Sequence, residues 1–184
     1  MMKTAFGITL LVGTGVAFAQ PKEAPKKDAP KEAPAPAPMA KPTPAKELDA
    51  TKDWQKTWAC TATNDGGEKV LGKLALKKEL EGFWVGLVMS TQKTKTMPAF
   101  LGQAVFGVDP VSKAWVMTGY DNMGGWINMK GKEATAISMI WEGEAGNMSG
   151  KKVPAKFTMT LADKKKLKFI GEFGGKKAFE HDCK

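Results

Sequence analysis

The sequence predicts an all-β domain, an antiparallel up-and-down meander closed into a barrel of about eight to ten strands. Alternating apolar and polar residues recur after residue 53, turn-forming residues separate these segments, and no window has the 3.6-residue apolar spacing of a helix. The connections are short, so successive strands are neighbours in space. A sheet of that many strands curls, and closure removes its edges. An immunoglobulin-like sandwich is the competing architecture, but no long Greek-key connection is visible.

The first 19 residues have the features of a secretory signal peptide. Lys3 precedes an apolar stretch that ends in Ala17-Phe18-Ala19, the small-x-small pattern that signal peptidase cuts. An uncleaved membrane anchor is the alternative, but the apolar run is shorter than the roughly 20 residues that span a bilayer. We therefore expect cleavage between Ala19 and Gln20, and a secreted or periplasmic protein.

Residues 20–47 differ in composition from the rest of the chain. They hold eight of its 11 prolines, with Ala, Lys and Glu between them. Such a segment cannot bury apolar surface and favours an extended polyproline-like conformation, so we expect a disordered linker. A single β-barrel domain is then expected over residues 48–184.

The strand-like segments of this domain follow one another with one apolar and one polar face. The first, residues 54–63, contains Cys60. The alternating segments after it span residues 70–77, 83–91, 115–120, 156–161 and 166–173. Turns rich in Gly, Asn, Asp or Pro are expected at residues 64–67, 81–82, 109–110, 122–125, 130–132 and 163–164.

The two cysteines test whether the meander closes. Cys60 lies in the first strand-like segment, and Cys183 is the penultimate residue. In a closed meander the first and last strands are neighbours, so the two thiols meet and an oxidising compartment joins them. We therefore predict a Cys60–Cys183 disulfide. The alternative is a reactive or metal-binding Cys183 beside His181 and Asp182, but no other clear soft ligand lies close in sequence.

The domain is basic, with 21 Lys against 14 Asp and Glu after residue 50, and the chain has no Arg. Nucleic-acid grooves use Arg for bidentate and stacking contacts, and the aromatic residues here fall at core-like alternating positions, so we expect no nucleic-acid partner. A Lys-rich exterior keeps strands soluble and permits weak contact with anionic envelope surfaces.

The segment Phe106–Gly124 (FGVDPVSKAWVMTGYDNMG) carries a family resemblance. It resembles the bacterial domain of unknown function 1579 family, in which a Gly-Tyr-Asp-like strand end, a short turn and a Lys-Trp or Lys-Tyr strand precede an Asp-x-Met-Gly-like segment. The meander pattern extends the resemblance loosely over residues 50–180. It implies a lipocalin-like antiparallel barrel and no particular activity.

Candidate catalytic residues are few. A hydrolase triad needs a base, and the one histidine, His181, lies near the chain end beside the predicted disulfide. Glu142 and Glu144 share one face of a strand, as a carboxylate pair does, and Tyr120 with Asp121 is a further candidate. We interpret the glutamates as a solvent-exposed strand end and expect a non-catalytic protein.

We expect no cofactor and no metal. Haem would need His181 as its axial ligand, and the adjacent Cys183 favours tethering at the rim of the barrel rather than projection into a cavity. Eight methionines lie in the domain, but none forms the Met-x-Met or Met-x-x-Met cluster typical of copper(I) sites. We interpret them as adaptable apolar filling or pocket wall.

The leading hypothesis is a barrel that binds a small apolar or amphipathic ligand without catalysis, because a barrel of this size has room for one small ligand. The alternative is a structural or interaction protein of the cell envelope, with a filled barrel and a Lys-rich surface. A one-residue error in register would reverse the inward face of any strand. The expected pocket wall consists of apolar and aromatic residues: Phe83, Trp84, Met89, Trp115, Met117, Trp126, Met139, Trp141, Phe157 and Met159.

Overall fold

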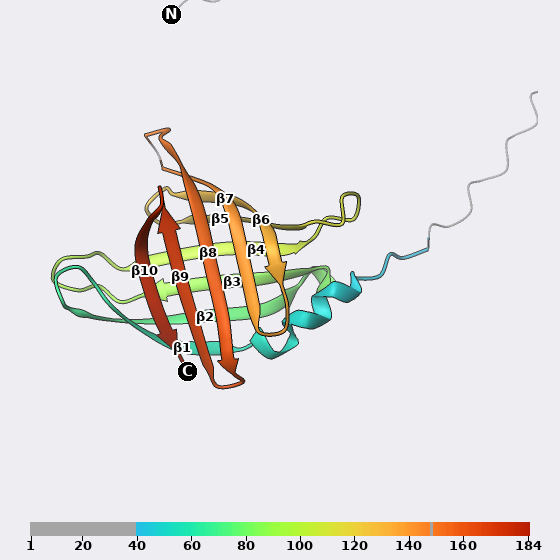
Figure 1. Ribbon diagram of the computed structural model, residues 1–184, viewed down its shortest axis with the longest axis horizontal. Helices are drawn as coiled ribbons and strands as arrows, with labels where there is room; N and C mark the ends of the chain where they lie inside the picture. The colour runs from blue at the N-terminus through green and yellow to red at the C-terminus, as the bar shows by residue number, and fades with distance from the viewer. Residues whose placement is uncertain (1–39, 148) are drawn as a thin grey trace, which may run out of the picture. The chain divides into compact units, whose positions relative to one another are not determined.

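Ten antiparallel strands form one closed barrel, in which each strand pairs with its sequence neighbours and the last returns to the first (Figure 1). The computed structural model describes residues 40–147 and 149–184, so the predicted signal peptide and most of the predicted linker lie outside the described residues. The predicted closed meander is confirmed. The strands are β1 (Thr57–Thr63), β2 (Lys69–Glu79), β3 (Trp84–Thr91), β4 (Phe100–Val108), β5 (Trp115–Asp121), β6 (Trp126–Ala134), β7 (Ser138–Gly146), β8 (Lys152–Asp163), β9 (Lys166–Phe173) and β10 (Lys176–Cys183).

Burial alternates along the strands as the sequence pattern predicts. On β8, Ala155, Phe157, Met159 and Leu161 are buried, while the residues between them are more exposed. Each large apolar side chain that is fully buried in this way stabilises the fold by about 1.5–3 kcal/mol. The barrel interior is therefore the hydrophobic core of the domain.

A 3-10 helix, η1 (Lys46–Trp54), lies at one end of the barrel (Figure 1). It contributes Leu48 and Trp54 to the core. Two hydrogen bonds fix it locally, from Thr51 Oγ1 to Leu48 O at 2.7 Å and from Trp58 Nε1 to Trp54 O at 3.1 Å. A second 3-10 helix, η2 (Leu80–Gly82), joins β2 to β3. Within the described residues, no helix has the length and apolarity needed to cross a membrane.

Strand β6 continues through residues 130–132, where the sequence predicts a turn. The register with β7 shifts between Gly131 and Glu133, so this segment is a β-bulge. Gly131 is required there because an added Cβ would lie 2.5 Å from Cβ of Trp115. The chain reverses at residues 135–137 instead, where Thr135 N donates a hydrogen bond to Ser138 O at 2.8 Å.

The barrel closes where β1 meets β10. Cys60 and Cys183 form the predicted disulfide, with their Cα atoms 4.0 Å apart. The register at this seam is short, pairing Cys60 with Cys183 and Thr61 with Asp182. Ala59 and Lys184 add two backbone hydrogen bonds of 2.9 Å each. The disulfide thus joins the first and last strands and is consistent with an oxidising environment.

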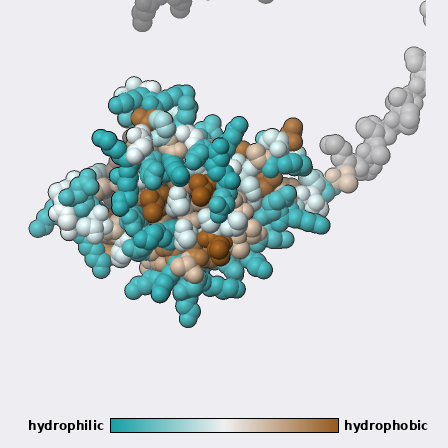
Figure 2. Space-filling model, viewed as in Figure 1, coloured by the Kyte–Doolittle hydropathy of each residue, from teal (hydrophilic) through white to brown (hydrophobic). Residues whose placement is uncertain are grey.

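The outer surface is largely hydrophilic. Figure 2 shows hydrophilic side chains over most of the face that β8, β9 and β10 form, with small separate apolar areas. Several lysines there are paired with acids, as Lys168 Nζ is with Glu180 Oε1 at 2.6 Å and with Asp182 Oδ1 at 3.4 Å. These two carboxylates raise the pKa of Lys168, the Glu180 hydrogen bond contributing most.

Candidate ligand-binding cavity

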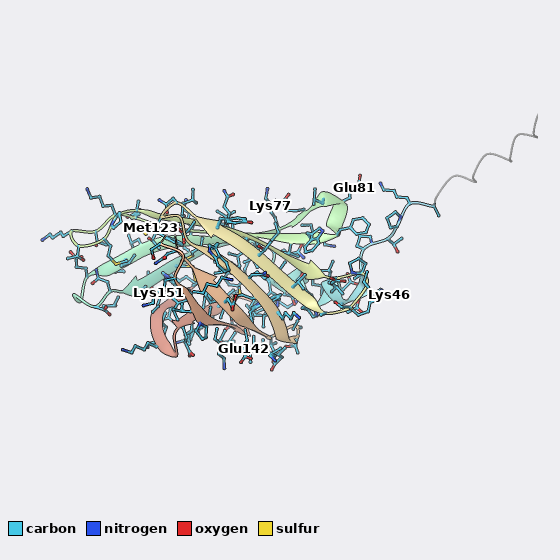
Figure 3. The ribbon with its side chains drawn as sticks, turned by 90° about the horizontal axis from the view of Figure 1, so that it is seen from above. Lys46, Lys77, Glu81, Met123, Glu142 and Lys151 are labelled. Carbon is cyan, nitrogen blue, oxygen red and sulfur yellow. A yellow bond between two sulfur atoms is a disulfide. The ribbon has the colours of Figure 1, made fainter. Side chains whose placement is uncertain are left out.

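The barrel is filled at one end and hollow at the other. At the η1 end, which we call the filled end, the largest fully buried side chains include Trp54, Trp58, Phe106 and Trp141. At the opposite end, the open end, lies a cavity of 380 Å³. Figure 3 shows Lys46 at the filled end and Met123, which borders the cavity, at the other.

The cavity exists because small residues replace large ones along two adjacent strands. On β4 the inward positions run from Phe106 at the filled end to Ala104 and Gly102 in the cavity wall. On β5, Met117 is buried at the filled end, whereas Gly119 lines the cavity. An added Cβ on Gly119 would lie 2.7 Å from Cβ of Ala104, so position 119 admits no residue larger than glycine.

Four aromatic residues form another part of the wall. Phe157, Phe169, Phe173 and Phe179, the phenylalanine cluster, all line the cavity. Their rings meet edge to face, with centroids 5.5 Å apart for Phe157 and Phe169 and 5.1 Å for Phe169 and Phe179. Gly171 admits the Phe179 ring, which would lie 2.2 Å from an added Cβ. This part of the wall is aromatic and apolar.

His181 brings a polar group to this apolar wall. The residue lines the cavity and is only 6% exposed, and its ring centroid lies 5.4 Å from that of Phe179. Its Nδ1 atom is buried without a hydrogen-bond partner among the described residues. Burial lowers the pKa of His181 despite the opposing charge of Asp182, so the imidazole is neutral at neutral pH.

The position of His181 corrects one expectation. The sequence predicts this residue at the rim, because Cys183 is tied into the disulfide. Side chains two apart on a strand lie on the same face. Because the Cys183 side chain points into the barrel, the His181 side chain points into it as well. Both residues are buried. The same alternation in the sequence was the signal that could have placed His181 in the cavity.

Two of the predicted pocket residues, Met89 and Phe157, line the cavity with their side chains on the buried face. Trp115 packs at the filled end, with its ring centroid 6.3 Å from Phe106 and 6.2 Å from Trp141. The other predicted residues that fill the core outside the cavity wall are Met117, Met139, Trp141 and Met159.

The remaining three predicted residues do not point into the barrel. Phe83 precedes β3, in the connection that η2 begins. Trp84 lies over Gly107, an outward position between the buried Phe106 and Val108. Trp126 borders the cavity mouth, but its ring packs outside against Gly146 and beneath Lys152, whose Nζ lies 5.4 Å from the ring centroid. Glycines on the neighbouring strands make room for both tryptophans.

Several wall residues cannot be predicted from the sequence, for identifiable reasons. Phe169 and Phe173 belong to one apolar strand face in the sequence, but nothing in the sequence shows which height of the barrel is hollow. Phe179 lies in the polar segment KKAFEHDC, where a register shift between Lys177 and Phe179 interrupts the alternation. Small wall residues such as Ala104 and Gly119 give no positive sequence signal at all.

Hydrogen bonds tie two loops together at the open end. Thr96 Oγ1 donates to Glu68 Oε2 at 2.8 Å, and Asn64 Nδ2 donates to the same oxygen at 3.0 Å. These bonds, Thr96 first, lower the pKa of Glu68 to about 2. We call these three residues the rim link, because they connect the β1–β2 turn to the β3–β4 loop.

A second hollow adjoins the cavity at the seam. This groove of 480 Å³ runs along β1 and β10 and has a more polar lining, including Thr61, Lys69 and Glu180. Ala62 and Phe179 line both the groove and the cavity. The groove lies where the β1–β10 register has ended, so the barrel wall is incomplete beside the cavity.

The candidate catalytic groups have structural partners. Glu142 points outward between Lys156 and Lys132, with N–O distances of 3.7 and 3.8 Å, and Glu144 pairs with Lys152 at 3.5 Å.

Tyr120 is 69% exposed on the outer face. Asp121 Oδ1 accepts hydrogen bonds of 2.8 Å from the backbone N of Met123 and of Gly125, which shapes the β5–β6 turn. Within the described residues, no three His, Cys, Asp or Glu side chains are grouped so as to hold a metal ion.

Comparisons with known proteins add little to this geometry. No family model matches the chain, and no curated protein matches it. Among solved structures the chain is similar to a redesigned β-barrel, with 12% sequence identity and a TM-score of 0.43 over 73% of this chain and 93% of that chain.

Proposed function

We propose that this barrel binds a small apolar or amphipathic ligand in its open half, without catalysis. The observation that carries the proposal is the 380 Å³ cavity in a barrel whose other half is packed. Small-molecule sites typically occupy about 300–1,000 Å³ and combine a mostly apolar wall with few polar groups. The phenylalanine cluster and His181 have this composition.

The favourable free energy of binding comes from burying apolar surface of the ligand against the apolar wall of the cavity. Removing apolar surface from water contributes roughly 25 cal/mol per Å², and rigid aromatic rings lose little entropy when a ligand packs on them. The disulfide and the filled end hold the wall in place before binding, so the ligand does not have to order the protein. We therefore expect the ligand to bind without a large change in the conformation of the barrel.

Binding is tested with N-phenylnaphthylamine, whose fluorescence rises in apolar surroundings. The wild-type protein is expected to give a saturable increase with one site per chain. Ala104→Phe places a ring in the cavity and is expected to weaken binding at least tenfold, since the site is then occupied. Val105→Phe is the matched control, because the adjacent side chain is 38% exposed on the outer face.

Thermal unfolding of all three proteins, followed by circular dichroism, checks that each variant is folded. A folded Ala104→Phe protein that binds the probe as tightly as wild type would contradict the proposed site. A wild-type protein that binds no apolar probe, but adheres to anionic vesicles in a salt-sensitive way, would favour the envelope-interaction alternative instead.

A further inference from the structure

We propose that the ligand is a small monocarboxylic acid with an apolar body, and that its carboxyl group pairs with His181. This inference rests on the proposed binding function. Its starting point is the scarcity of buried polar side chains: within the described residues, these are Thr51 and His181. Thr51 belongs to η1 at the filled end and is hydrogen-bonded to Leu48 O. His181 is therefore the buried polar group that a ligand in the cavity would meet.

The hydrogen bonding of His181 is incomplete. Buried polar atoms in proteins nearly always have a partner, and each exception calls for an explanation. Two further buried nitrogens without partners in the described residues, Nε1 of Trp54 and of Trp141, belong to residues of the filled end, outside the cavity wall. Nδ1 of His181 instead belongs to a side chain of the cavity wall. A hydrogen-bonding group of the ligand would complete the site.

A carboxyl group fits this site because it can share one proton with the imidazole. The pair then carries no net charge, whether written as imidazolium with carboxylate or imidazole with carboxylic acid, and a buried charge is tolerated when it is paired. A phosphate or sulfate would bring more charge than one imidazole can balance. The carboxylate enters with one proton taken from solvent, and no covalent bond forms or breaks.

Of the charged groups around His181, Asp182 raises the His181 pKa in opposition to burial, which favours the imidazolium form of the proposed pair. On β10 the neighbouring Glu180 and Asp182 are engaged with Lys168 outside the barrel. On β9 the residue opposite His181 is Phe169. Strand β1 has no ionisable side chain, because its one cysteine is in the disulfide.

Two acidic residues, Asp65 and Asp121, do line the cavity, in or beside the turns of its mouth. Their carboxylates would attract an amine rather than an acid, so the experiment below also includes an amine.

The pairing makes acid binding depend on pH. In the empty protein burial lowers the pKa of His181, and a bound carboxylate raises it, so binding above the lower value takes up a proton. Affinity for the acid is therefore expected to fall as pH rises between the two pKa values, by up to tenfold per pH unit. Affinity for an alcohol of the same chain is expected to stay constant.

His181 is the single histidine of the chain, so its ring gives one set of imidazole signals in an NMR spectrum. The full-length protein is titrated with decanoate, decanol and decylamine, and the His181 pKa is measured in each complex. Decanoate is expected to move the pKa upward and decanol is not. Calorimetry in two buffers of different ionisation enthalpy then counts the protons taken up.

His181→Phe keeps an aromatic ring but removes the nitrogens. It is expected to lower decanoate affinity roughly tenfold to a hundredfold more than decanol affinity, as loss of a charge-assisted hydrogen bond does. If this variant does not fold, the wild-type pKa measurement decides the question.

The outcomes separate the two proposals. If neither decanoate nor decanol binds wild type, or if Ala104→Phe leaves their binding unchanged, the proposed site itself fails. If both bind but the His181 pKa does not rise with decanoate, the site stands and the inference is overturned. Tighter binding of decylamine than of decanoate would overturn it as well, because the acidic residues at the mouth would then select the ligand.

Discussion

The filled end and the open end of the barrel are built from the same ten strands, yet one is packed and the other is hollow. On β4 the inward side chain changes from Phe106 to Ala104 within two residues, and on β5 it changes from Met117 to Gly119. The backbone pairing is continuous across both changes. Side-chain size, rather than strand geometry, therefore decides where this barrel has a cavity.

This division also separates stability from binding. Protein cores are packed as densely as organic crystals, so a side chain at the filled end makes contacts on all sides. A side chain in the cavity wall lacks partners on one side and contributes less dispersion energy. The filled end should accordingly carry most of the stability, which leaves the open end free to accept a ligand.

Truncating one phenylalanine at each end is the strongest test of the difference in packing between the filled end and the open end. Phe106 is fully buried, with its ring centroid 5.3 Å from that of Trp141, so Phe106→Ala is expected to cost about 3–5 kcal/mol of unfolding free energy. Phe173 is half-buried and borders the cavity, so Phe173→Ala is expected to cost about 1–2 kcal/mol. Chemical denaturation measures both, and equal losses would show that the two ends do not differ in packing.

The seam supplies the second test. The described β1–β10 register contains two residue pairs, whereas β1 and β2 are paired at seven positions, so the disulfide is the main tie between the first and last strands. Removing both sulfurs with Cys60→Ala and Cys183→Ala is expected to lower the unfolding free energy by about 2–5 kcal/mol.

Hydrogen exchange tests the same double variant at the level of the strands. Amides of β1 and β10 are expected to exchange faster than those of β5 and β6, which lie on the opposite side of the strand order. Uniformly faster exchange over all ten strands would mean that the seam is no weaker than the rest of the wall.

Much of the fold was predictable because it depends on patterns that the sequence states directly. Alternation marks the strands, short turns imply sequential neighbours, and the positions of Cys60 and Cys183 predict closure. The turn expected at residues 130–132 was wrong because Gly131 serves a bulge beside Trp115. Local composition cannot separate these two uses of glycine, since the deciding contact comes from another strand.

The site was less predictable than the fold. Alternation correctly placed Met89 and Phe157 on the inner face, but the height of each residue along the barrel depends on the tilt and register of ten strands. Bulky apolar residues on the inner face are predicted as pocket wall. Trp141 and Met139 are also bulky and inward, but they fill the core instead. A cavity is marked by small residues such as Gly119, whose presence in a strand has no distinctive sequence signature.

The smallest expected effect is at the rim link, where Thr96→Val removes the hydroxyl that joins the two loops of the open end. Thr96 is exposed, so little change in unfolding free energy is expected, but hydrogen exchange in residues 92–99 and ligand release should both become faster. Thr135→Val is the matched control, because it removes a hydroxyl bonded to Ser138 O in a turn at the filled end.

The rim link should also hold over a wide pH range. The pKa of Glu68 is about 2 rather than the ordinary 4.5, so its carboxylate stays charged in the linked state, and the contribution of the link to stability is lost progressively as pH falls from about 4.5 toward 2. Between about pH 8 and pH 5.5 the release rate of decanol should therefore not change through Glu68, whereas decanoate binding should follow His181. A decanol release rate that rises between about pH 8 and pH 5.5 in wild type, but not in Thr96→Val, would show that the link opens at higher pH than its hydrogen bonds imply. The open end would then be controlled at its mouth as well as by the size of the side chains in its wall.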